Sequence, residues 1–131
     1  MKTYRIALIP GDGIGKDVID AAWQVLERVA DKTGFGLEPT SFPWSCAYYK
    51  ETGAMMPADG IATLRGFDAI LLGAVGCPAE VHDYVSLHGL LLPIRKAFEQ
   101  YANLRPHRLP PGVEGPLKAK AFDLLGIRVN T

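Results

Sequence analysis

The feature that most constrains this chain is an apolar run followed at once by a glycine-rich turn and an amphipathic segment. The run Tyr4 to Ile9 is closed by Pro10-Gly11-Asp12-Gly13, which is typical of a buried strand that ends in a loop. From Ile14 onward, apolar residues recur at steps of three and four as far as Val29. The pattern therefore predicts an amphipathic helix that ends near Gly34.

The rest of the chain continues this alternation of strands and helices. Phe67 to Val75 is apolar almost throughout, as expected of a central parallel strand covered on both faces. Pro93 falls inside a predicted helix and must sit in its first turn or bend its axis. The other predicted strands are residues 37–42, 102–109 and 122–129, the other predicted helices are 58–64 and 87–101, and irregular structure is predicted around Tyr48, Tyr49 and 55–57, with a loop from 76 to about 85. The alternation predicts an α/β fold with right-handed β-α-β units and a mainly parallel sheet.

Length and charge narrow the classes of function. The chain has 131 residues, which fits one domain or part of one, with 14 basic and 14 acidic residues and no net charge. This balance argues against a binder of nucleic acid or anionic membrane, which needs an excess of basic residues. The longest apolar runs stop far short of the ~20 residues of a membrane-spanning helix, and the first is too short for a secretory signal. Small molecules or proteins remain as partners.

The two cysteines, Cys46 and Cys77, form no metal-ligand pair such as C-x-x-C. Two free thiols in a reducing compartment, the cytoplasm, are therefore expected. Neither cysteine has a base beside it in the sequence, so both are interpreted as small apolar residues. His82, His88 and His107 are dispersed without ligand spacing, and each is interpreted as a solvated or hydrogen-bonded side chain.

The turn Gly11-Asp12-Gly13-Ile14-Gly15 could approach a ligand, because it follows a predicted strand and opens a predicted helix. The dinucleotide-binding pattern is G-x-G-x-x-G, and here the third glycine arrives one residue early. No acidic residue marks a ribose-binding strand end. Two interpretations stay open: a plain glycine turn, or a loop close to a nucleotide without the Rossmann geometry.

Three arginines form a second candidate group. Arg95 lies late on a predicted helix, Arg105 on the next strand, and Arg128 near the end of the last strand. A short connection can bring Arg95 and Arg105 to one edge of the sheet. Paired guanidinium forks bind carboxylates bidentately, so the group predicts an organic-acid site. The alternative is that these arginines are solvated on the surface.

Several motifs together resemble the isocitrate and isopropylmalate dehydrogenase family of β-decarboxylating dehydrogenases. They are residues 9–15, Leu71-Leu72-Gly73-Ala74-Val75-Gly76, Leu91-Leu92-Pro93-Ile94-Arg95 and Asn103-Leu104-Arg105-Pro106. Residues 42–46 with Tyr48-Tyr49, 55–57 and 89–95 look most like the branch of tartrate dehydrogenase and decarboxylating D-malate dehydrogenase. The resemblance covers nearly the whole chain but only the N-terminal part of the family's length.

The resemblance implies the N-terminal part of an isopropylmalate dehydrogenase-like fold, with residues 1–131 a single incomplete domain. It implies an NAD-linked enzyme that uses Mg or Mn to oxidise and decarboxylate a small 2-hydroxy acid, and a homodimer in the complete protein. Arg95, Arg105 and Arg128 match the arginines that grip the substrate. By the same resemblance, Ile14 and the loop from Cys77 to His88 lie near the nicotinamide.

The family's catalytic lysine and tyrosine and its aspartate metal ligands are expected beyond residue 131, so this chain alone is expected to be an inactive fragment. Val129 stands where the family usually has an acidic residue, and His88 where the branch usually has Trp. The alternatives are a 3-isopropylmalate dehydrogenase, or a non-catalytic regulatory or interaction module of the same fold. Retention of the three arginines favours an enzyme, and NAD against NADP stays open.

Overall fold

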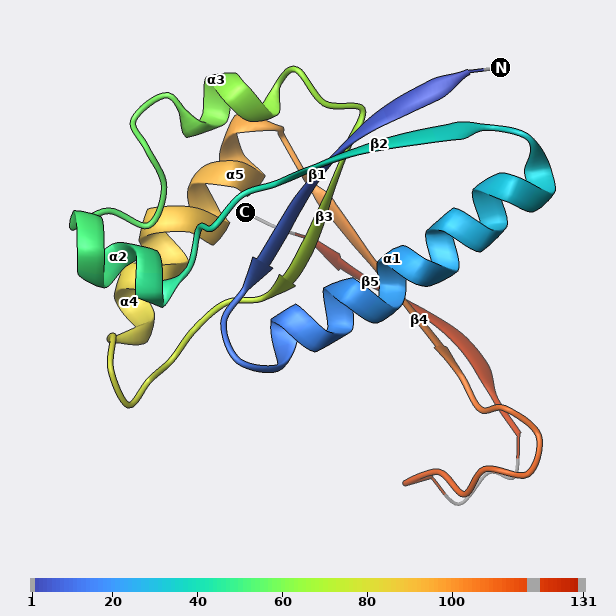
Figure 1. Ribbon diagram of the computed structural model, residues 1–131. Coiled ribbons are helices and arrows are strands. Elements are labelled where there is room, and N and C mark those ends of the chain that lie inside the picture. Colours follow the sequence, from blue (N-terminus) through green and yellow to red (C-terminus); the bar gives the residue numbers. More distant parts are fainter. Residues whose placement is uncertain (1, 118–120, 130–131) are drawn as a thin grey trace. The chain divides into compact units, whose positions relative to one another are not determined.

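In a computed structural model of the protein, residues 2–117 and 121–129 are described, and the chain forms two compact units, Met1–Ile94 and Arg95–Thr131. The first contains β1 (Thr3–Gly11), α1 (Ile14–Thr33), β2 (Gly36–Ser41), α2 (Cys46–Thr52), α3 (Gly60–Leu64), β3 (Ala69–Ala74), α4 (Asp83–Ser86) and the π-helical turn η1 (Leu87–Leu91) (Figure 1). The helix α5 (Leu92–Ala97) spans the division, and the second unit contains β4 (Ala102–Arg108) and β5 (Asp123–Val129).

The first unit is built on a parallel sheet with the strand order β2-β1-β3. Its central strand β1 buries residues 6–9, and α1 packs on the sheet through Ile19 and half-buried Trp23. Gly34 adopts a left-handed conformation and ends α1. The predicted strand, turn and helix are therefore confirmed. The outer strand β2 carries Pro39, which lies opposite Ile6 in the register.

The position of β3 differs from the prediction. Residues 67–75 were expected to form a central strand, but β3 pairs only with β1 among the described residues. Ala69 and Leu72 are exposed, and no residue of β3 is fully buried. An apolar run indicates that a strand will be covered, but it does not specify which strand lies in the middle of a sheet.

Three glycines allow the turn after β1 to lie directly on β3. A Cβ atom at Gly15 would lie 2.6 Å from the backbone nitrogen of Ala74 and would clash with the carbonyl oxygen of Pro10. At Gly73 it would clash with the same Pro10 carbonyl and lie 3.0 Å from the carbonyl oxygen of Gly15. Gly11 has a φ of +77°, and a Cβ atom there would clash with the carbonyl oxygen of Ala74. Close backbone packing therefore explains these glycines.

A helix forms where irregular structure was predicted. The Ser45 hydroxyl oxygen accepts a hydrogen bond from the backbone N–H of Tyr48 at 3.1 Å and caps α2. Gly53, with a φ of +79°, ends this helix. The prediction of irregular structure around Tyr48 and Tyr49 is therefore wrong, whereas the short helix α3 is close to its predicted range.

The predicted helix 87–101 is shifted and divided. It begins at Asp83, inside the predicted loop, and α5 ends at Ala97. At the end of η1 the N–H of Leu92 donates to the carbonyl of Leu87, a wide five-residue turn. Pro93, which has no N–H to donate, follows in the first turn of α5, as one of the two predicted arrangements required.

In the second unit β4 and β5 form an antiparallel two-stranded sheet in which Arg105 lies opposite Gly126 and Asn103 opposite Arg128. Both strands lie within their predicted ranges. They do not extend the parallel pattern, because the described residues between them contain no helix that could carry the chain back. That connection includes residues 118–120, and the C-terminal Asn130 and Thr131 also lie outside the described residues.

No helix in the described parts of the chain has the length and apolar content needed to cross a bilayer.

The close packing of the β1–α1 turn on β3 makes one position highly sensitive to substitution. We expect Gly73→Ala to lower the free energy of unfolding by about 1–3 kcal/mol, because the added methyl group meets backbone atoms that cannot move aside. Urea denaturation followed by tryptophan fluorescence measures the change. Gly66→Ala is the matched control, since its Cβ would lie no closer than 3.4 Å to any neighbour. Equal stability of the two variants would contradict the packing argument.

Candidate functional site

The side chain of Asp12 ties together three loops at the carboxyl edge of the parallel sheet. Its Oδ1 atom accepts a hydrogen bond from the backbone N–H of Cys46 at 3.0 Å. Its Oδ2 atom accepts from the N–H of Cys46 and from that of Gly76, each at 3.1 Å. The backbone N–H of Asp12 in turn donates to the carbonyl of Ala74 at 2.7 Å. One carboxylate thus holds the turn after β1, the start of α2 and the loop after β3.

These contacts fix the charge of the cluster. Burial favours the neutral carboxyl of Asp12, but hydrogen bonds from the backbone of Cys46 and Gly76 and from the Cys46 thiol together lower its pKa below the ordinary 3.8. Burial, followed by the hydrogen bond to Asp12, raises the pKa of the Cys46 thiol to about 11. Asp12 is therefore ionised and Cys46 protonated at neutral pH, and the buried thiol is a poor nucleophile.

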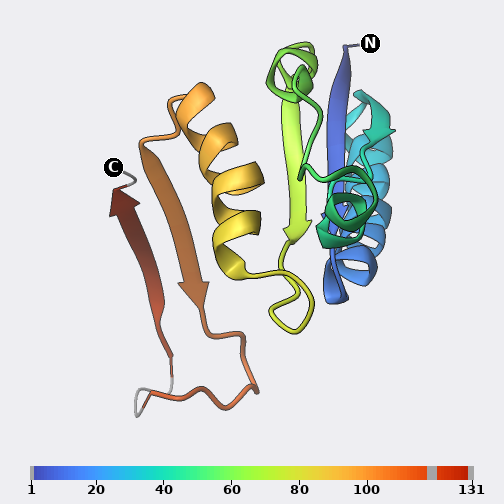
Figure 2. The same ribbon diagram turned by 90° about the vertical axis from the view of Figure 1, so that its left-hand side faces the viewer.

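The Asp12 cluster occupies the place where open α/β sheets usually bind ligands. In the strand order, β2 lies next to β1 on one edge and β3 lies next to β1 on the other. The direction in which successive strands are added therefore reverses between β1 and β3. Figure 2 shows these two strands ending at the same edge. The amides of Cys46 and Gly76 at this edge already bind the carboxylate of Asp12. The glycine turn is thus explained by packing and by an internal anion, and contact with a nucleotide stays a prediction.

The residues predicted to lie near a cofactor are all in the first unit. Ile14, at the start of α1, is 69% exposed, and half-buried Cys77 follows β3, so both lie at the carboxyl edge. His88 lies exposed in η1 and stacks on the ring of Tyr84, with 4.0 Å between ring centroids. Tyr84 was not predicted from the sequence as a neighbour of His88. The spacing of four residues on a helix could have indicated this contact. The cofactor role of Ile14, Cys77 and His88 stays a prediction.

A surface ion pair connects α2 with the loop that contains Cys77. The Lys50 ammonium donates to the Glu80 carboxylate at 2.9 Å, and this hydrogen bond raises the pKa of Lys50. The pair links α2 to the loop after β3, on the surface. Both cysteines are free thiols, as predicted, with Cys46 buried and Cys77 half-buried.

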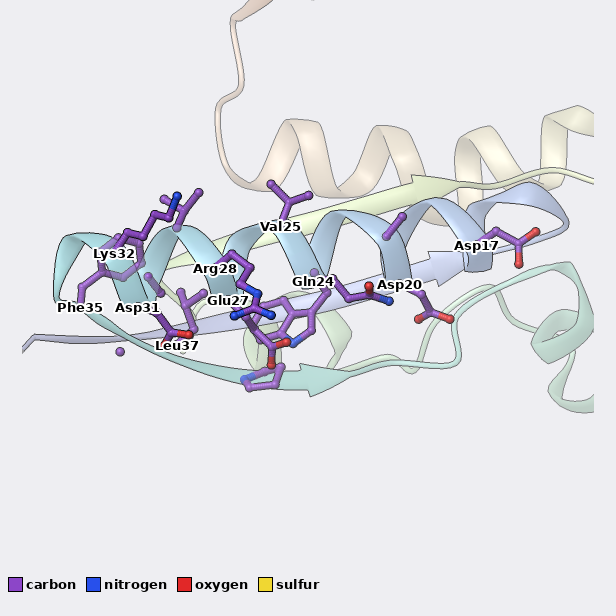
Figure 3. A pocket seen from close by; sticks show the side chains of 16 residues that line it. Asp17, Asp20, Gln24, Val25, Glu27, Arg28, Asp31, Lys32, Phe35 and Leu37 are labelled. Carbon is purple, nitrogen blue, oxygen red and sulfur yellow. The ribbon is translucent and has the colours of Figure 1, made fainter.

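A groove in the first unit lies away from these residues. It has a volume of about 1140 Å³ and runs between α1 and β2 (Figure 3). Its lining includes side chains of both charges. The acidic ones are Asp17, Asp20, Glu27 and Asp31, and the basic ones are Arg28 and Lys32. It contains none of the predicted site residues, so it is not the candidate site.

Two of the three predicted arginines come together in the second unit. Because Arg105 lies opposite Gly126 and Arg128 opposite Asn103, the two arginines share one face as diagonal neighbours across the strand pair. The Nε–H of Arg105 donates to the Oδ1 atom of Asn103 at 3.3 Å, on the side of Arg128. Both arginines are exposed, and no carboxylate in the described ranges forms an ion pair with either of them.

Arg95 lies on α5, two residues before its end, and is half-buried. Its backbone carbonyl accepts a hydrogen bond from the N–H of Gln100 at 2.9 Å, in the turn that leads to β4. The strand register that relates Arg105 to Arg128 does not include Arg95. The convergence of all three arginines therefore stays a prediction, while the structure places two of them on one face.

A metal ion needs several ligating side chains in one place. The described residues contain no group of three or more His, Cys, Asp or Glu side chains arranged to hold a metal ion. Metal binding by the complete protein stays a prediction.

The Asp12 contacts lead to a pH-dependent prediction. We expect Asp12→Asn to lower the free energy of unfolding by about 1–3 kcal/mol at pH 7, because it removes charge-assisted hydrogen bonds at a half-buried site. The pKa of Asp12 is lower in the folded chain than in the unfolded one. Its contribution is therefore full above about pH 4 and is lost as the pH falls through the folded value.

Urea denaturation of the wild-type chain and the variant between pH 7 and pH 2.5 measures this difference. The two stabilities should converge at the acidic end. Asp20→Asn, at an exposed position of α1, is the control and should change stability by less than about 0.5 kcal/mol. A difference between wild type and Asp12→Asn that did not change with pH would show that the charge of Asp12 is not what holds the loops.

Comparisons with known proteins agree on one family. Residues 5–131 match the family described as isocitrate/isopropylmalate dehydrogenase. The chain is 50% identical to a probable tartrate dehydrogenase/decarboxylase of Bacillus subtilis, over all of this chain and 38% of that protein. It is also 50% identical to D-malate dehydrogenase [decarboxylating] of Escherichia coli, over all of this chain and 37% of that protein. The chain thus spans little more than a third of the length of these relatives.

Solved structures agree with the α/β fold class predicted from the sequence. The TT0538 protein of Thermus thermophilus has a TM-score of 0.69 and 30% identity, over 96% of this chain and 24% of that one. A β-decarboxylating dehydrogenase of Thermococcus kodakarensis has a TM-score of 0.61 and 30% identity, over 95% of this chain and 41% of that one. The match over residues 5–131 and the shared fold together establish that the chain belongs to the isocitrate/isopropylmalate dehydrogenase family.

Proposed function

We propose that this chain is the N-terminal third of a metal-dependent, NAD-linked oxidoreductase that oxidises and decarboxylates a small 2-hydroxy acid such as D-malate or tartrate. The names of the relatives at 50% identity support the reaction class and the acid. The observation that carries the proposal is the pair Arg105 and Arg128, which share one exposed face with no acidic partner among the described residues. Two guanidinium groups on one face without a described ion-pair partner suit a dicarboxylic acid.

In this proposal the protein's own side chains bind and orient the acid. Arg105 and Arg128 each offer a planar fork of N–H donors to a carboxylate, and Arg95 is proposed as a third. Holding both ends of a short dicarboxylic acid fixes the carbon that is oxidised and the carboxylate that leaves. The bound NAD supplies the hydride acceptor.

The proposed cofactor contacts are side-chain contacts along the carboxyl edge of the first unit, from Ile14, Cys77 and His88. The N–H groups of Cys46 and Gly76 are not proposed to bind the phosphates of NAD, because they already donate to the Asp12 carboxylate. The residues that would hold the Mg or Mn ion are proposed to lie beyond residue 131. The complete protein is proposed to be a homodimer in the reducing cytoplasm.

His88 favours a small polar acid over 3-isopropylmalate. Its imidazole is exposed beside Tyr84 and can donate a hydrogen bond to a hydroxyl or carboxylate oxygen. An isopropyl group bound against it would exclude water without supplying an acceptor. The competing candidates are a 3-isopropylmalate dehydrogenase and a non-catalytic module of the same fold. Absorbance at 340 nm distinguishes them, since NADH formation with D-malate or tartrate, with 3-isopropylmalate, or with neither indicates one of the three.

The arginine assignment predicts a specific kinetic effect in the full-length enzyme. Arg105→Lys and Arg128→Lys should each lower kcat/KM for the hydroxy acid roughly ten- to hundred-fold, because lysine keeps the charge but loses the fork. The KM for NAD should barely move. Arg108→Lys, on the opposite face of β4, is the matched control and should behave as wild type. Wild-type kcat/KM in both site variants would overturn the assignment.

The 131-residue chain by itself should be inactive. Its described residues contain no cluster of three or more metal-ligating side chains. The family's catalytic lysine and tyrosine are proposed to lie beyond residue 131. Purified residues 1–131 with Mg or Mn, NAD and D-malate should therefore give no NADH. Turnover by this chain would refute the proposal that it is one third of the catalytic unit.

A further inference from the structure

The two faces of the β4–β5 hairpin have different chemistry. The first, called the polar face, consists of Asn103, Arg105, His107, Leu124, Gly126 and Arg128. It contains no acidic side chain. The only described carboxylate of the hairpin strands, Asp123, lies on the other face, 4.0 Å from Arg108. The polar face therefore combines two cations, an imidazole and an amide without internal neutralisation.

Gly126 leaves the middle of this face without a side chain, and this position is called the floor. Its φ is not in the left-handed region, so the backbone conformation does not require glycine. A Cβ atom there would meet its nearest neighbours at ordinary distances, 3.4 Å from the carbonyl oxygen and 3.7 Å from the Cβ atom of Arg105. Crowding does not require glycine either. A glycine inside a strand often marks a bulge, a bend, or a place where a ligand or another backbone approaches closely. The register of β4 and β5 runs through Gly126 without a bulge, which favours a close approach.

His107 borders this floor. Its Nε2 atom would lie 3.8 Å from a Cβ atom at Gly126, so the imidazole leans across the strand pair toward the open position. On the other side, the Arg105 side chain is held toward Asn103 by its hydrogen bond, next to Arg128. The floor at Gly126 is thus bordered by the imidazole at one end and by the guanidinium groups at the other.

We propose that His107 is a further substrate-binding residue, whose imidazole donates a hydrogen bond to a carboxylate or hydroxyl oxygen of a dicarboxylic acid lying over Gly126 beside Arg105 and Arg128. This inference rests on the proposed function, because that function supplies the acid. It differs from the interpretation of the sequence, in which His107 is a solvated or hydrogen-bonded side chain and not a ligand-binding residue. Each imidazole nitrogen can serve as donor to an oxygen ligand when protonated, and one of them does so in the neutral ring.

Steady-state kinetics of the full-length enzyme with D-malate and with tartrate tests the role of His107. His107→Ala should raise KM for the acid about 3- to 12-fold, the effect of losing one hydrogen bond, with KM for NAD unchanged. His107→Gln, which keeps an N–H donor, should recover most of the loss. Gly126→Val, which fills the floor, should also raise KM for the acid.

Arg108→Ala is the matched control. It removes a cation from the adjacent position of the same strand but on the opposite face, so KM for the acid should stay at the wild-type value. If wild type is active and His107→Ala leaves KM for the acid unchanged, or changes both KM values equally, the inference about His107 is wrong while the proposed function stands. An inactive wild-type enzyme would overturn the proposed function and this inference together.

Discussion

The first unit depends on the hydrogen bonds that one carboxylate accepts. Asp12 receives the N–H groups of Cys46 and Gly76, residues 34 and 64 positions away in the sequence. Without this anion, the amides at the start of α2 and after β3 would lose their partners in a partly buried place, where an unpaired donor costs about 1–3 kcal/mol. The same contacts set the path of the loop to Cys77 and thus the start of the segment that leads to His88. The protein supplies its own anion where many α/β proteins bind one from a ligand.

The first 42 residues could be predicted well, because the pattern and the stop signals agree. The apolar run of β1, the helical spacing of α1 and Gly34 at its end all indicate the same elements. The helix α2 could not be predicted, since seven residues carry too little apolar periodicity and the helix depends on the Ser45 cap beside buried Trp44. The wide turn before Pro93 was equally inaccessible, because proline indicates a local break but not how the helix absorbs it.

The candidate site shows a similar division. The chemistry of Arg105 and Arg128 was visible in the sequence, but their common face follows from the antiparallel register of β4 and β5, which the alternation of strands and helices did not predict. His107 gave no signal of its own, as a single histidine on a strand has no spacing to interpret. Its relation to Arg105 and Gly126 exists only once the strand pair is formed. The role of Asp12 was hidden for the same reason, since its partners are remote in sequence.

Pro39, in the middle of β2, has a consequence for how the sheet can grow. Proline fits an edge strand when its nitrogen faces away from the partner, so the outer edge of β2 lacks one ladder donor at that position. Another strand, from this protein or a neighbouring molecule, would find an interrupted row of amides there. The outer edge of β3 has no proline over residues 69–74. Among the described residues, the sheet thus has a proline-interrupted edge at β2, which is protected against edge-to-edge aggregation, and an edge without proline at β3.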